Sequence, residues 1–136
     1  MRVGRGRAVK LDTTSLANAV QRLREGLARH QREPTDEQVR DGLIQRFEFT
    51  YELGWKCMFY WLRAQKEKVP EVVRPVIQAA YRAELIADAD LWEKIKDCRD
   101  ETSHTYDQKK AVEVAAFVRG SAVQAFDILL AKLKTL

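Results

Sequence analysis

The sequence contains little of what disulfide-rich or metal-binding domains depend on. Only two of its 136 residues are cysteine and two are histidine, and there is no CxxC pair. The spacings of Cys57, Cys98, His30 and His104 match no known zinc-ligand pattern, so we expect neither a metal nor a cofactor. Because residues 1–10 lack the apolar stretch of a secretory signal, the sequence favours a reduced, cytoplasmic environment, with Cys57 as a small core residue.

Glycine, proline and long hydrophobic runs are also scarce. Six glycines and three prolines argue against a turn-rich all-β fold. No stretch approaches the ~18 consecutive apolar residues of a membrane span, so we expect no membrane partner. A content of 46% hydrophobic and 32% charged residues excludes a disordered chain, and the length suits a single compact domain.

The positive charge of the sequence lies at its N-terminus. The four cations Arg2, Arg5, Arg7 and Lys10 account for the whole net charge of +4, and no acid accompanies them. We therefore predict a flexible basic tail at residues 1–11 and a single domain at residues 12–136. The tail is either a simple solvated segment or a contact for RNA or an acidic surface.

Apolar residues recur every three to four positions in almost the whole chain, which predicts helices. A first helix follows Thr13 or Thr14 as its cap, and a long second helix opens at Asp36 and continues to about Lys66. Gly54, inside the second helix, is interpreted as a site of close packing against a neighbouring helix. The inward stripe of this helix is predicted to consist of Val39, Leu43, Phe47, Tyr51, Met58 and Leu62.

Three further helices are predicted in the second half. Pro75 suits the first turn of a third helix that carries Tyr81 among its apolar positions, and Asp88 or Asp90 begins a short one. Asp107 caps the last helix, whose apolar positions include Val112. The predicted fold class is all-α, an antiparallel up-and-down four-helix bundle with an additional short helix.

The second helix carries more large aromatic residues than one core face can take. We expect some of them to face a second copy of the chain, which predicts a homodimer. These residues are Phe47, Phe49, Trp55, Phe59 and Trp61.

Reactive polar side chains crowd into residues 99–107, where the short helix is expected to end. Arg99 offers a permanent forked cation that suits phosphate oxygens, and His104 can exchange a proton near neutral pH. Together they suit phosphodiester chemistry without a metal, with Arg99 and His104 as catalytic residues. Asp100, Ser103 and Tyr106 complete the candidate site, although Thr102, Ser103 and Asp107 could equally be ordinary helix caps.

Arg99 and His104 are five residues apart, about 140° around a regular helix. They therefore cannot lie side by side on one continuous face. Either the helix breaks between them, or each meets its counterpart from a second copy across a two-fold axis.

Two segments resemble a known family. Arg99-x4-His104-x-Tyr106 resembles the RX4HXY motif of HepT-like proteins of the HEPN superfamily, and residues 45–56 resemble that family's RFEFTYELxWK stretch. The resemblance, over roughly residues 12–134, implies a HEPN-like dimeric bundle with the paired motifs at the interface. It also implies a toxin that cleaves RNA without a metal and a minimal nucleotidyltransferase antitoxin that silences it by transferring AMP to Tyr106. The older family label, nucleotidyltransferase substrate-binding protein, favours an alternative, a non-catalytic subunit that binds a nucleotide substrate.

Glu48, Glu52 and Lys56 are four residues apart and share one face of the second helix. In one interpretation they form surface or half-buried ion pairs. In the other they support the candidate site, and one of the two carboxylates reaches across to Arg99 and fixes its orientation.

Overall fold

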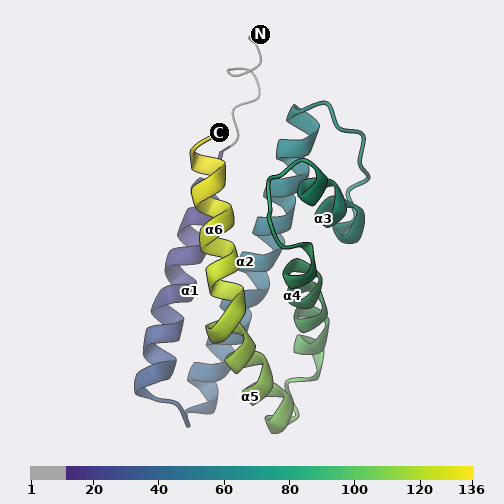
Figure 1. The fold of residues 1–136 in the computed structure, drawn as a ribbon. Coiled ribbons are helices and arrows are strands. Elements are labelled where there is room, and N and C mark those ends of the chain that lie inside the picture. Colours follow the sequence, from purple (N-terminus) through teal and green to yellow (C-terminus); the bar gives the residue numbers. More distant parts are fainter. Residues whose placement is uncertain (1–11) are drawn as a thin grey trace.

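The computed structural model describes residues 12–136, so the basic tail predicted at residues 1–11 lies outside the described residues. Four helical segments run alternately up and down, as predicted (Figure 1). They are α1 (Thr14–Arg32), α2 (Glu37–Ala64), α4 (Ala89–Glu101) and a last segment in which α5 (Gln108–Phe117) continues through the π-helical residues Val118–Ala122 into α6 (Val123–Lys134). The short helix α3 (Val73–Arg82) lies beside one end of α2 and α4.

Aspartates begin three of the helices by accepting the free backbone N–H groups of the first turn. The structure confirms the predicted cap at Asp107 of α5, and it places Asp36 as the cap of α2 and Asp88, one of the two predicted starts, as the cap of α4. Thr13, one of the two residues predicted to cap α1, stands at its N-cap position, but its side chain makes no capping bond. Asp12 instead accepts the Thr14 backbone N–H at 2.9 Å.

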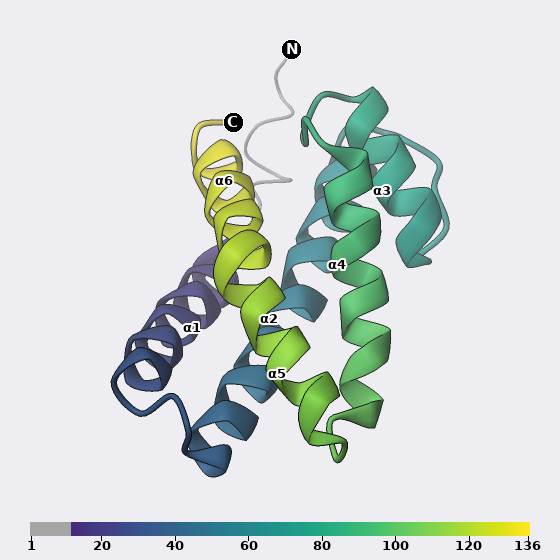
Figure 2. The ribbon, with the colours of Figure 1, turned by 60° about the horizontal axis from the view of Figure 1, so that its bottom comes forward.

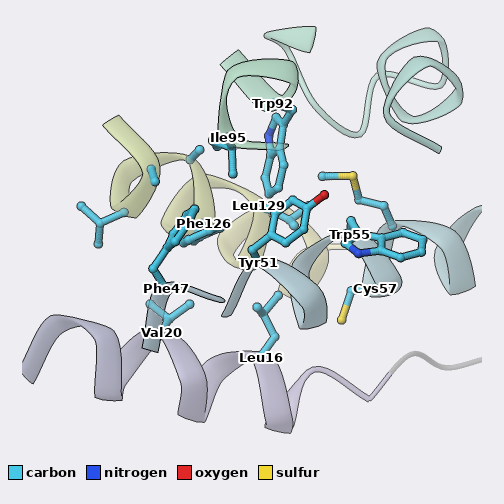
Figure 3. Packing of buried hydrophobic residues seen from close by; sticks show 14 of the residues in the cluster. Leu16, Val20, Phe47, Tyr51, Trp55, Cys57, Trp92, Ile95, Phe126 and Leu129 are labelled. Atoms are coloured by element: carbon cyan, nitrogen blue, oxygen red, sulfur yellow. The ribbon is translucent and has the colours of Figure 1, made fainter. Parts of the chain in front are cut away.

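Helix α2 lies in the middle of the bundle and packs against the other five helices (Figure 2). Its aromatic side chains meet α4 and α6 in the core, where Phe47 and Trp92 both lie against Phe126 (Figure 3). Gly54 is buried, and a Cβ there would lie 3.5 Å from the Trp92 ring. The predicted close packing at this glycine is therefore confirmed.

Some expectations about burial are wrong. Tyr81 is 49% exposed and Val112 is also exposed, although both were placed on apolar faces. Of the five aromatic residues of α2 that were expected to exceed one core face, three are buried within the single chain and two are half-buried, because α3 and α4 cover a second face of this helix. The aromatic content therefore supports a homodimer less than expected, and the homodimer stays a prediction.

The stretch Gln108–Lys134 is long and apolar enough, by length and composition, to cross a membrane. Its buried residues, among them Val118 and Phe126, belong to the same core as α1 and α2. The stretch therefore has the character of a core helix of the bundle.

Phe47→Ala tests the core directly. Phe47 is fully buried between α1, α2 and α6, so its truncation removes apolar contacts and leaves a cavity. We expect a loss of about 3–5 kcal/mol in the free energy of unfolding, measured by chemical denaturation. Tyr81→Ala is the matched control: its ring is half-exposed, and its effect is expected to stay within about 1 kcal/mol. Equal losses in both variants would contradict this account of the core.

Candidate functional site

The end of α4 is shaped by three hydroxyl side chains. Thr102, Ser103 and Thr105 each bond to the backbone carbonyl three residues earlier, at 2.7, 3.0 and 3.0 Å. Such bonds satisfy carbonyl groups that have no partner at a helix C-terminus. The chain therefore leaves the α-helix at Glu101, passes through a 3₁₀ turn at Thr102–His104, and enters α5 at the Asp107 cap.

Arg99 is held by α2. Its Nη1 lies 3.4 Å from Glu48 Oε2 and donates to the Thr102 hydroxyl at 2.9 Å, while its Nε lies 3.7 Å from Glu52 Oε2. The last distance makes an ion pair but is too long for a hydrogen bond, so the buried Nε has no hydrogen-bond partner within residues 12–136. Two carboxylates thus flank one guanidinium and fix its orientation.

The carboxylates are in turn held by their own neighbours. The Trp55 indole donates to Glu52 Oε1 at 3.1 Å, and the single proton of the Thr102 hydroxyl is shared between Glu48 Oε2, at 2.6 Å, and the Arg99 carbonyl. The expected reach of a carboxylate from α2 to Arg99 is therefore present. Lys56 takes no part in it, because it is exposed and its Nζ lies 5.9 Å from the Trp55 ring centroid.

His104 and Tyr106 lie together on the outside of the 3₁₀ turn. The imidazole Nδ1 is 3.4 Å from the Tyr106 hydroxyl, and the two rings meet edge to face at a centroid distance of 6.0 Å. Tyr106 is 82% exposed, and His104 is exposed as well. Both functional groups are therefore open to a large substrate or a modifying enzyme.

The helix breaks between Arg99 and His104, which is the first of the two arrangements expected from their spacing. Arg99 faces α2, whereas His104 lies on the exposed turn beside Tyr106. The single chain thus presents an anchored cation and an exposed imidazole on the two sides of one short turn.

A surface groove of about 590 Å³ adjoins Arg99. Its lining includes Lys96 and Asp100 of α4, Ser103 of the 3₁₀ turn and Trp55 of α2. The predicted residues Asp100 and Ser103 therefore share a groove with Arg99. Lys96 donates to Asp100 at 2.7 Å and adds a second cation.

An ion pair ties the end of α4 to α5. Lys110 Nζ lies 2.9 Å from Glu101 Oε1, and this contact lowers the pKa of the Glu101 carboxyl and raises the pKa of the Lys110 ammonium. The pair links the two helices on either side of the segment that carries His104 and Tyr106, but as a solvent-exposed pair it contributes little to holding them.

Residues 12–136 contain no cluster of three or more His, Cys, Asp or Glu side chains placed to hold a metal ion. Both cysteines are free, and Cys57 is buried as predicted. Burial raises the pKa of both thiols, that of Cys98 to about 12, so neither is suited to act as a thiolate nucleophile.

Sequence reasoning treated two residues of this site too simply. Thr102 was considered only as a cap, yet it is buried and bonds Arg99 and Glu48 at once. Lys96 was not singled out, although it lies three residues before Arg99 on the same helical face. That i, i+3 spacing of two cations was the available signal.

Residues 11–135 match the protein family described as "Nucleotidyltransferase substrate binding protein like". The chain is also 35% identical, over 92 residues, to "Probable ribonuclease HepT" of Haemophilus influenzae. That alignment covers 65% of this chain and 63% of the relative, so it spans slightly less than two thirds of either protein.

Two solved structures are similar along nearly their whole length. One, from Haemophilus influenzae, is described as revealing the fold of a substrate binding domain of a nucleotidyltransferase; its TM-score is 0.81 at 27% identity, covering 90% of this chain and 99% of that one. The other is a protein from Thermus thermophilus with a TM-score of 0.75 at 26% identity, covering 88% of this chain and 98% of that one. The similarity in fold therefore extends over most of the bundle.

Proposed function

Because the chain belongs to the nucleotidyltransferase substrate binding protein like family, a HepT-like family of the HEPN type, we propose that it is a metal-independent ribonuclease. In this proposal it is the toxin of a toxin–antitoxin pair, acts in the cytoplasm as a homodimer, and uses Arg99 and His104 of both copies. The observation that carries the proposal is the exposed His104 imidazole beside a turn whose arginine is fixed by two carboxylates.

The proposed cleavage uses the ribose as its own nucleophile. One His104 accepts the proton of the 2′-hydroxyl, and the 2′-oxygen forms a bond to the phosphorus. The bond from phosphorus to the 5′-oxygen breaks, and the His104 of the second copy, in its protonated form, donates a proton to that oxygen. The products are a 2′,3′-cyclic phosphate and a 5′-hydroxyl end, while Arg99 stabilises the charge on the phosphoryl oxygens.

Regulation by a minimal nucleotidyltransferase forms the second part of the proposal. The Tyr106 hydroxyl oxygen attacks the α-phosphorus of ATP and releases pyrophosphate, while the partner enzyme takes the phenolic proton. The added AMP places a phosphate next to His104, where it competes with RNA by charge and bulk. The exposure of Tyr106 and its 3.4 Å separation from His104 support this assignment.

Cleavage without a metal is tested with purified chain, single-stranded RNA and an excess of EDTA. We expect cleavage to continue in EDTA, with 2′,3′-cyclic phosphate and 5′-hydroxyl ends identified by mass spectrometry of the fragments. Cleavage that stops in EDTA and returns with Mg²⁺, or fragments with 5′-phosphate ends, would contradict the mechanism.

One observation favours a second function, a non-catalytic subunit that binds a nucleotide for its nucleotidyltransferase partner. Glu48 and Glu52 reduce the charge that Arg99 can offer to a transition state, and both the matched family and the similar Haemophilus influenzae structure are described in terms of substrate binding. This function predicts nucleotide binding in calorimetry, alone or with the partner, together with no RNA cleavage under any condition.

A further inference from the structure

A second cavity, of about 300 Å³, lies where the end of α1, the start of α2 and α5 meet. It is lined by the basic side chains of His30, Arg40 and Arg119, and none of its lining residues belongs to the groove at Arg99. Arg119 lies in the π-helical segment Val118–Ala122, a kind of helix distortion that recurs at functional sites.

The two arginines of this cavity have no carboxylate partner. Arg40 is only 7% exposed; its Nη2 donates to Gln108 Oε1, and its Nε has no hydrogen-bond partner within residues 12–136. Arg119 Nη2 donates to the Leu27 carbonyl at 3.2 Å. Across residues 12–136 neither guanidinium lies within ion-pair distance of an acid, and residues 1–11 contain no Asp or Glu.

Four of the acids nearest in sequence are engaged elsewhere, and Asp41, next to Arg40, is exposed and is not ion-paired with it within residues 12–136. Glu33 pairs with Arg29, Asp36 caps α2, Glu37 accepts from Gln108, and Glu113 pairs with Lys110. None of these acids pairs directly with Arg40 or Arg119; Glu37 is linked to Arg40 only through the Gln108 amide.

His30, the third basic side chain of the cavity, takes part as a neutral hydrogen-bonding group. Arg119 Nη2 lies 3.0 Å from His30 Nδ1, and a guanidinium can only donate, so Nδ1 accepts and the imidazole proton is on Nε2. Burial lowers the pKa of His30, and the nearby Arg119 and Arg40 lower it further. The proton-bearing Nε2 is left as an additional donor.

Burying a guanidinium without an opposite charge is costly, and an anion between the two arginines would remove that cost. Forked guanidinium groups match the paired oxygens of phosphate. The remaining wall is largely apolar and includes Pro34, Val112 and Ala115. The cavity has roughly ten times the ~30 Å³ that one water molecule occupies in the liquid, which leaves room for an organic group beside a phosphate.

We propose that this cavity is a second anion-binding site, separate from the Arg99 groove, and that it takes a small phosphorylated molecule. Its phosphate binds between Arg40 and Arg119, and its organic part lies against Val112 and Ala115. The site requires only one copy of the chain, and its existence does not depend on the ribonuclease proposal.

The test is titration calorimetry at constant ionic strength, with inorganic phosphate, AMP and adenosine as probes. We expect phosphate and AMP to bind the wild-type chain, AMP more tightly because its organic part adds contacts, and adenosine to bind far more weakly. In Arg40→Met and in Arg119→Gln, we expect the affinity for phosphate and AMP to fall by at least about tenfold, which corresponds to about 1.4 kcal/mol.

Two controls separate this site from the rest of the molecule. Arg82→Met removes an exposed arginine at the end of α3 and should leave the affinities unchanged, and Arg99→Met should leave phosphate binding in the second cavity intact. Arg40→Met should also keep or increase the free energy of unfolding, because methionine replaces a buried charge that has no acidic partner. The proposal is overturned if wild type binds neither phosphate nor AMP. It is equally overturned if Arg99→Met loses phosphate binding while Arg40→Met and Arg119→Gln keep it.

Discussion

His104→Ala is expected to reduce the rate of RNA cleavage by about 10²- to 10⁴-fold, the contribution that a positioned general acid or base usually makes. The variant removes both proposed proton-transfer groups of the dimer at once. Since His104 is exposed and its one side-chain hydrogen bond within residues 12–136 is to the exposed Tyr106, the fold and its thermal midpoint should remain unchanged. The measurement is the initial rate of cleavage of a fluorescently labelled RNA in EDTA, alongside growth of cells that express each variant without a nucleotidyltransferase.

His104→Gln is the discriminating companion. Glutamine keeps a hydrogen-bonding group at this position but cannot exchange a proton near neutral pH. If His104 transfers protons, the glutamine variant should be as inactive as the alanine variant, and neither should arrest growth. A glutamine variant that retains cleavage would reduce His104 to a substrate contact. If the wild-type chain and the His104→Ala variant both leave growth unaffected and both fail to cleave RNA, the non-catalytic subunit is favoured.

Helix boundaries were predictable because their signals are local. An aspartate before an apolar stripe is sufficient to place a helix start, and Asp36, Asp88 and Asp107 all behave in this way. Exposure was less predictable, as at Tyr81 and Val112, because it depends on which neighbouring helix covers a face. The π-helical segment at Val118–Ala122 adds a further shift, since the extra residue in its turn rotates all later side chains relative to a regular helix.

The candidate site was predictable only as far as its residues are contiguous. The possible helix break, the hydroxyl side chains and the RX4HXY motif could all be recognised in the run from Arg99 to Asp107, because they lie within nine consecutive residues. The carboxylate partners of Arg99 lie about fifty residues away on α2. The even spacing of Glu48 and Glu52 predicted a shared face, and a reach to Arg99 was one of two alternatives that the spacing could not decide between.

The second cavity illustrates the same limit more strongly. Its basic residues, His30, Arg40 and Arg119, come from three separate elements and form no motif in the sequence. Their convergence depends on how α1, α2 and the π-helical segment pack, which no local pattern encodes. Charges without nearby opposite charges can be identified only once the fold is known.

Tyr106→Phe is expected to abolish AMP transfer by the partner nucleotidyltransferase. The change removes a single oxygen, the proposed nucleophile, and leaves the ring in place beside His104. Intact-mass analysis after incubation with the partner enzyme and ATP should show added AMP on the wild-type chain and an unchanged mass for the variant. Because the silencing group is then missing, the variant should still cleave RNA after this incubation, whereas the wild-type chain should not.

Tyr81→Phe is the matched control for this experiment, since Tyr81 is also exposed but lies on α3, away from the motif. It should gain AMP and lose cleavage as the wild-type chain does. If the Tyr106→Phe variant gains AMP, another residue is the acceptor, and the proposed regulatory role of Tyr106 is contradicted. The His104→Ala variant, which keeps Tyr106, should still gain AMP. In this proposal the phenolic oxygen alone accepts the nucleotide, and the imidazole serves only RNA cleavage.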